Sequence, residues 1–245
     1  MQVEAESGEN SSEVEIDVRV VYKAFEKAWN ACRDDYDDRR INAEHTLQAA
    51  LYFHLRSGLD SRKNFFVLTE LKGKLSDSQK TSSGKIRDVL DLVVARRVPN
   101  EKGGKLEILA AIELKYLPRS VPSDEAIRKD MTSLSRVWQN KDKDSRSDFE
   151  VVRFNGHSTQ VEVLNKRVLI YGYVAADHAS EGLRDKFWSG NRVPKEGRWV
   201  DVVQPSRLVI AHCLTSKDAN GNPKQSTVGF DGLLHRKFTD QAVRN

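Results

Sequence analysis

Apolar residues recur at intervals of three and four along two early segments of the chain. Between residues 14 and 32 the apolar side chains that share one helical face are Val18, Val21, Phe25 and Trp29. Residues 42–56 repeat this spacing, and a second common face is formed by Leu47, Ala50, Leu51, His54 and Leu55. Such spacing predicts two amphipathic helices, the second ending near Gly58.

Extended patterns dominate the middle of the chain. Runs rich in β-branched and aromatic residues predict strands at 64–71, 89–95, 106–116, 167–176, 200–203 and 207–214. The turn-forming segment 99–104 predicts that the second and third of these strands pair as an antiparallel hairpin. A helix is predicted over 124–138, capped by Ser123 or Asp124. Segments without periodicity predict loops at 75–85, 139–149 and 218–225.

This order of elements predicts one α/β domain with a central mixed β-sheet flanked by helices. We expect the domain to span residues 13–245, with an N-terminal helix and a C-terminal strand and loop extension. Residues 1–12 hold almost no apolar mass and predict a disordered acidic tail. A chain of 245 residues can bury a substantial core.

Charge and cysteine content narrow the classes of partner and compartment. The formal charge is +4 with a pI of about 9.0. Much of the acid lies in residues 1–17 and 34–38, so the rest of the chain is more basic, which favours a polyanionic partner. The two cysteines, Cys32 and Cys213, lack metal-site spacing and predict reduced thiols. With no apolar run long enough for a bilayer, we expect no membrane partner and a cytoplasmic location.

Acidic and basic side chains converge on the predicted hairpin. Alternation along a strand places Glu113 and Lys115 on one face, and an in-register hairpin brings Asp91 beside Glu113. Two adjacent carboxylates favour a divalent cation, with magnesium as the natural candidate and the main-chain carbonyl of Leu114 as a further ligand. Lys115 would orient the attacking water and stabilise charge on a phosphodiester. Glu44 reaches the same metal if its helix packs across the sheet edge.

The ordered series of these elements resembles the PD-(D/E)xK nuclease superfamily, which has a restriction-endonuclease-like fold. The resemblance covers roughly residues 42–174 and rests on a helix bearing Glu44, a strand containing Glu70, the strand of Asp91, the strand of Glu113 and Lys115, and the helix 124–138. It implies Mg²⁺-dependent cleavage of DNA or sometimes RNA, with Mn²⁺ as a substitute. It also implies metal ligation by Asp91 and Glu113, with Lys115 in catalysis.

One departure from the family pattern concerns the first acidic ligand. No proline precedes Asp91, and Asp88 becomes the alternative ligand if the strand register shifts, because a shift of one residue reverses the faces. We prefer Asp91.

Simpler explanations exist for each residue. Glu113 and Lys115 alone fit a surface ion pair, and Glu44 fits an acid favoured by the helix dipole. Glu70 and Lys72 repeat the Glu-x-Lys spacing without a preceding Asp strand, so we favour surface charge for them, with a supporting role behind the metal ligands as the alternative. The six histidines are scattered, without zinc-site spacing: His45, His54, His157, His178, His212 and His235.

Aromatic and basic residues in the last half of the chain fit core packing and surface charge better than nucleic-acid contacts. They are Trp138, Phe187, Trp188 and Trp199, with Lys186, Arg192, Lys195 and Arg198. No phosphate-binding loop, dinucleotide fingerprint or nucleophile-elbow serine occurs.

The leading hypothesis is a magnesium-dependent deoxyribonuclease, with DNA preferred over RNA on the family resemblance. The alternative is a catalytically inactive nuclease-fold module that binds nucleic acid or a protein partner, and a purely structural protein ranks third. The sequence permits a homo-oligomer and leaves open endonuclease or exonuclease action, the target and the pathway.

Overall fold

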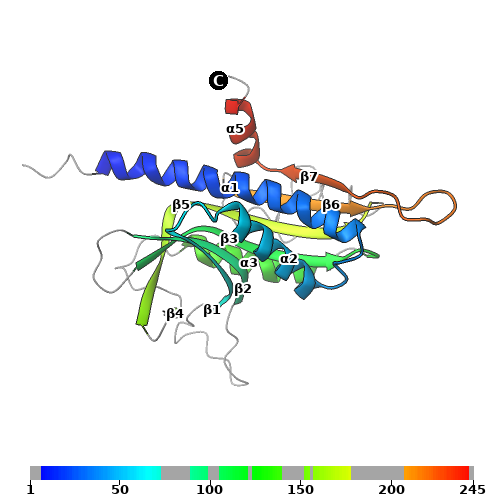
Figure 1. Cartoon of the computed structure of the whole chain (residues 1–245), viewed down its shortest axis with the longest axis horizontal. Helices are drawn as coiled ribbons and strands as arrows, with labels where there is room; N and C mark the ends of the chain where they lie inside the picture. The colour runs from blue at the N-terminus through cyan, green and yellow to red at the C-terminus, as the bar shows by residue number, and fades with distance from the viewer. Residues whose placement is uncertain are drawn as a thin grey trace, which may run out of the picture.

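A mixed sheet forms the centre of the molecule. The computed structural model describes residues 7–72, 89–98, 105–120, 123–139, 152–154, 157–177 and 207–242. Across the sheet the order is β1 (Phe65–Lys72), β2 (Val89–Arg97), β3 (Lys105–Leu117), β5 (His157–Ala176), β6 (Leu208–Thr215) and β7 (Thr227–Asp231), and β4 (Val152–Phe154) pairs with β5 (Figure 1). β3, β5 and β6 run parallel, whereas the β1–β2, β2–β3 and β6–β7 pairs are antiparallel. The predicted α/β architecture and hairpin are confirmed.

Helices cover both faces of the sheet, as the strand alternation requires. α1 (Ser7–Asp37) and α2 (Glu44–Gly58) pack on one face, where Leu92 and Val94 of β2 join their core. α3 (Asp124–Gln139) packs on the other face, where Val93 and Ala95 point. Successive residues of one strand therefore enter two different cores, because side chains alternate along a strand.

A buried ion cluster ties α1 to the sheet. Arg96 of β2 is 6% exposed and places Nη1 2.6 Å from Asp17 Oδ2 and Nε 2.8 Å from Glu107 Oε2. Burial lowers the pKa of Arg96, but hydrogen bonds and charges of the two carboxylates outweigh it and leave the pKa raised. The charged side chains are thus satisfied where α1 crosses the strands.

α1 and β5 are both longer than the sequence predicted. α1 already includes residues 7–12, which we expected in the acidic tail, and extends to Asp37; acidic residues near a helix start favour the helix. β5 begins at His157, ten residues before the predicted start. The predicted strand at 200–203 lies outside the described residues.

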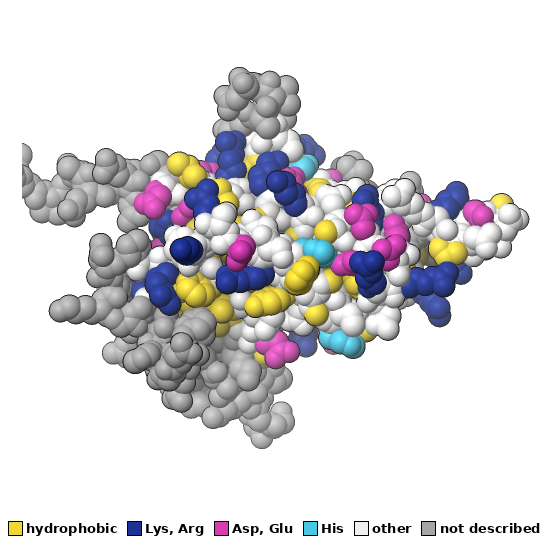
Figure 2. Space-filling view, viewed as in Figure 1, with side chains coloured by type: hydrophobic (Ala, Val, Ile, Leu, Met, Phe, Trp, Pro, Cys, Tyr) yellow, Lys and Arg dark blue, Asp and Glu magenta, His cyan; other side chains and the backbone are white. Residues whose placement is uncertain are grey.

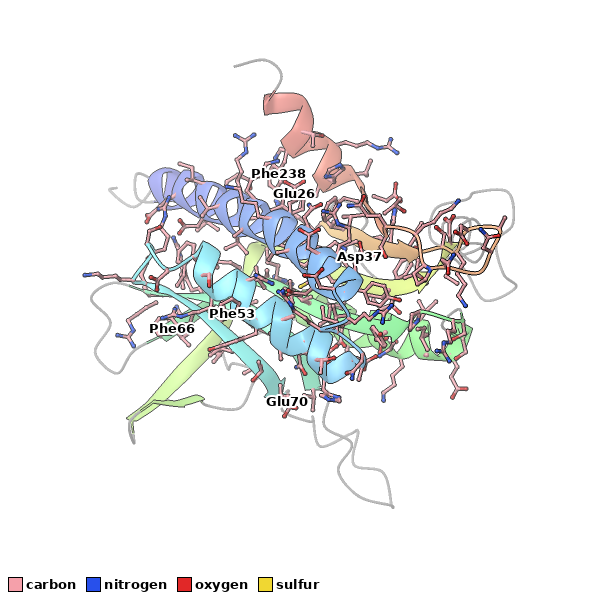
Figure 3. The ribbon with its side chains drawn as sticks, turned by 45° about the vertical axis from the view of Figure 1, so that its right-hand side comes forward. Glu26, Asp37, Phe53, Phe66, Glu70 and Phe238 are labelled. Atoms are coloured by element: carbon pink, nitrogen blue, oxygen red, sulfur yellow. The ribbon has the colours of Figure 1, made fainter. Side chains whose placement is uncertain are left out.

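The C-terminal segment contains β7 and α5 (Leu233–Ala242) beyond the predicted loop, and we predicted neither. Asp37 at the end of α1 fixes the start of β7, because its carboxylate accepts hydrogen bonds from the backbone N–H and the hydroxyl of Ser226. Phe238 of α5 packs on Tyr22 of α1, with ring centroids 5.3 Å apart (Figure 3). These contacts join the chain ends to one another.

Cys32 and Cys213 are both free and buried, which agrees with the predicted reduced thiols. Burial raises the pKa of both thiols, that of Cys213 to about 12. None of the helices in the described ranges is long and apolar enough to cross a membrane.

Candidate metal centre

The pairing of β2 with β3 ends just where the predicted acidic residues begin. The last paired residues are Leu92 and Ile112, so Asp91 and Glu113 stand at the point where the strands separate. Beyond it the backbone N–H of Leu114 donates to Asp91 Oδ2 at 2.7 Å, and Gln48 of α2 donates to the Asp91 carbonyl at 2.7 Å. Side chains thus replace ladder hydrogen bonds at this opening, which a buried backbone requires.

Glu113 is buried in this opening. It is 4% exposed, and its Oε1 atom has no hydrogen-bond partner among the described residues. Burial raises the pKa of Glu113 well above its ordinary value, and the nearby Asp91 and Asp130 carboxylates raise it further. Burial also raises the pKa of Asp91, although the Leu114 hydrogen bond and the charge of Lys115 oppose the shift. Both shifts disfavour ionisation of the two carboxyl groups, and a bound cation would offset them.

Lys115 lies between two carboxylates from different helices. Its Nζ atom is 3.2 Å from Asp130 Oδ2 of α3 and 3.7 Å from Glu44 Oε1 of α2. Burial lowers the pKa of Lys115, but Asp130 and Glu44 outweigh it, so the pKa is raised and the ammonium group is retained. Burial raises the pKa of Asp130 to about 6 against the opposing charge of Lys115.

The start of α2 places Glu44 at the site. Ala43 has no side chain to cap the helix, and the Thr46 hydroxyl instead accepts the backbone N–H groups of Asn42 and Ala43 at 3.1 and 3.0 Å. Glu44 is the first helical residue, and its Oε2 accepts the backbone N–H of Tyr116 at 3.3 Å. The first turn of α2 is thereby fixed against the end of β3.

The structure brings together the predicted side chains of Asp91, Glu113, Lys115 and Glu44. The alternative ligand Asp88 lies outside the described residues. Glu70 is exposed on the edge strand β1 (Figure 3), and the β1–β2 register places it opposite Asp91, because Thr69 pairs with Leu92 and Leu71 with Leu90.

Two further residues of the site were not predicted, Asp130 and Gln48. Asp130 carries a detectable signal in the sequence. It falls three residues after Ile127 and four before Leu134, both buried, so it lies on the apolar face of α3. An acid at such a position needs a partner.

The residues fit a divalent cation held partly by water. Asp91 and Glu113 offer adjacent hard oxygen atoms, one of them without a hydrogen bond. Among the described residues no group of three or more His, Cys, Asp or Glu side chains is arranged to hold a metal. Magnesium commonly binds through one or two carboxylates and retains several waters, so two carboxylates suffice for it.

Comparisons with known proteins add little to this geometry. Neither the scan against protein families nor the search of curated proteins found a match. Among solved structures, NucC of P. aeruginosa ATCC27853 in its cAAA-bound form is 11% identical with a TM-score of 0.33, covering 99% of this chain and 91% of that one. NucC of E. coli MS115-1, also cAAA-bound, is 11% identical with a TM-score of 0.34, covering 99% and 90%. Likeness at this level carries no argument about function.

Proposed function

We propose that the chain is a magnesium-dependent nuclease that hydrolyses phosphodiester bonds of DNA, with RNA as the alternative substrate. The observation that carries the proposal is the opening between β2 and β3. Two carboxyl groups share it, one buried oxygen has no hydrogen-bond partner, and an ammonium group lies beside them. The resemblance of the element order to the PD-(D/E)xK superfamily and its restriction-endonuclease-like core supports the same reaction.

The metal ligands in this proposal are Asp91, Glu113 and the main-chain carbonyl of Leu114. When bound, Mg²⁺ or its substitute Mn²⁺ supplies Lewis acidity and lowers the pKa of water. Binding requires both carboxyl groups to be ionised, and a bound cation would offset the burial that raises the pKa of each. The hydrogen bond from Leu114 orients the Asp91 carboxylate for this role.

Lys115 is the group that contacts the reacting phosphate in this proposal. Asp130 and Glu44 hold it protonated and restrict its position, because they contact it from two sides. A positioned cation stabilises the negative charge that develops on the phosphate oxygens in the transition state. Glu44 is a positioning residue for Lys115 and lies within reach of the same cation.

A cleavage assay on folded variants tests the proposal. Glu113→Ala and Lys115→Ala should each abolish cleavage of single-stranded and duplex DNA in magnesium while the variants stay folded. Asp60→Ala removes an exposed carboxylate just beyond the C-terminal end of α2, whereas Glu44 lies at the start of that helix, so this control should cut like the wild type. Cleavage that persists in EDTA, or in both active-site variants, would overturn the assignment.

A catalytically inactive nuclease-fold module is the second candidate, and one observation favours it. Asp130 already pairs with Lys115 at 3.2 Å, so the ammonium group is engaged within the fold. An inactive module would bind nucleic acid in EDTA, show no heat of magnesium binding by calorimetry, and cut nothing with any divalent metal.

A further inference from the structure

A large cavity opens where three parallel strands end. Its volume is about 1280 Å³, above the ~300–1,000 Å³ that is typical of a pocket for a small molecule. Pro118, Ala176 and Thr215 line it at the carboxyl ends of β3, β5 and β6. Ligands of open α/β sheets bind in the crevice at such ends. The size and position fit a short stretch of a polymer.

Tyrosine rings form part of the cavity wall. Tyr36 of α1 and Tyr116 of β3 both line it, with ring centroids 6.1 Å apart in an edge-to-face arrangement. The Tyr116 hydroxyl donates to the Ile41 carbonyl at 3.2 Å, which fixes the ring. Held aromatic rings in a basic groove are the common platform for unpaired bases.

The charges at the cavity favour an anion once internal ion pairs are considered. We call four lining side chains the basic rim: Arg39, Arg119, Lys217 and Lys224. Of the four acids that line the cavity, Asp34 pairs with Arg33 at 2.7 Å and Asp38 with Arg40 at 3.1 Å. The carboxylates of Asp37 and Asp177 then remain against the four cations of the basic rim. Within the described ranges none of these four cations has an ion pair. Figure 2 shows both signs of charge gathered where α1 ends.

Arg39 occupies a backbone position that glycine would fill more easily. Its φ is 62°, and its N–H donates to the Tyr36 carbonyl at 2.9 Å as α1 ends. Helices commonly end on glycine in this left-handed conformation. An arginine here accepts backbone strain and places a cation at the cavity wall.

The cavity lies next to the candidate metal centre at the end of β3, although none of the metal-centre side chains lines it. Tyr116 follows Lys115 in β3, and the backbone N–H of Tyr116 is bound by Glu44, which also contacts Lys115. We propose that the cavity binds a single strand of nucleic acid leaving the metal centre, with its phosphates on the basic rim and a base against the tyrosines. This inference rests on the proposed function for its direction, because the strand enters from the catalytic residues. A duplex keeps its bases stacked on one another and cannot use the rings.

Binding in EDTA tests the inference without requiring cleavage. The probes are fluorescent 15-mers of oligothymidine and oligouridine and a duplex of the same length, followed by anisotropy at several salt concentrations. The double variant Arg119→Ala/Lys217→Ala should bind the single strands about tenfold more weakly, with the salt slope reduced by about 1.4, since each phosphate contact on a single strand contributes about 0.7. Lys27→Ala/Lys129→Ala removes two exposed cations elsewhere and should bind like the wild type.

Arg39→Gly separates binding from stability. Glycine adopts positive φ without strain, so this variant should melt no lower than the wild type and yet bind the single strands more weakly. Rim variants that bind like the wild type, an equal loss in the control double variant, or tighter binding of duplex than of single strands would overturn the inference.

The same experiment distinguishes the two proposals. Glu113→Ala should bind single strands normally in EDTA because it does not touch the rim. Rim-dependent binding without any magnesium-dependent cleavage leaves the cavity assignment standing and refutes the enzyme. Magnesium-dependent cleavage together with binding that does not depend on the rim refutes the cavity assignment and leaves the enzyme proposal standing.

Discussion

Replacing Asp130 by asparagine should stabilise the metal-free protein increasingly as the pH rises. Burial raises the pKa of Asp130 from 3.8 to about 6 in the folded protein. A carboxyl whose pKa is raised by folding contributes its full stability below its unfolded pKa and loses it as the pH rises through the folded pKa. Asparagine carries no such charge, so it removes this loss.

The magnitude follows from the size of the pKa change. The rise is about two units, each unit corresponds to about 1.4 kcal/mol, and charged Asp130 therefore costs about 3 kcal/mol above pH 7. With Asp130 only 6% exposed, little solvent screening reduces this value. About 1.6 kcal/mol is already lost at pH 5, so the advantage of the variant should grow by about 1.3 kcal/mol from pH 5 to pH 7.

Urea and thermal unfolding in EDTA at pH 5 and pH 7 measure this difference. Comparing the two pH values cancels losses that do not depend on pH, such as the contact with Lys115, which Glu44 still pairs. The melting temperature of the variant should gain roughly 3–5 °C on the wild type across this range. Glu125→Gln, on the exposed face of α3, is the control and should gain nothing. A stability difference that is the same at both pH values would refute the reasoning.

Three further substitutions test other parts of the structure. By the same sign rule Glu113→Gln should stabilise the metal-free protein at pH 8 and abolish the rise in melting temperature on adding magnesium; a variant that magnesium still stabilises contradicts the ligand role. Arg96→Met leaves Asp17 buried without its partner and should cost about 3–5 kcal/mol in urea unfolding, and a loss below about 1 kcal/mol contradicts it. Gly172→Ala puts a methyl group 2.9 Å from the Trp29 ring and should cost about 1–3 kcal/mol in the same measurement; an unchanged midpoint contradicts it.

The strands and the core of the site could be predicted because their signals are local. Alternation in β2 and β3 needs only a few neighbouring residues, and the hairpin turn sets their pairing. From these two facts the positions of Asp91, Glu113 and Lys115 follow. The opening of the strands at Asp91 does not follow, because it depends on Gln48 and on the packing of α2.

Residues that act through tertiary packing escaped prediction. Asp130 joins the site only because α3 crosses the face of the sheet that bears Lys115. β7 and α5 are short, and their stability comes from contacts with α1, such as those of Asp37 and Phe238, rather than from their own sequence. Contacts between segments at opposite ends of the chain leave no pattern in the sequence of either segment.

The two buried thiols can report how often the folded protein opens. Cys32 belongs to α1 and Cys213 to β6, and a reagent in solution reaches neither while the helix covers the sheet. Because the raised pKa of each thiol also suppresses the thiolate that alkylating reagents attack, modification in native buffer reports the opened fraction of molecules. Slower alkylation with bound nucleic acid or metal would then measure their affinity for the folded state, without any added label.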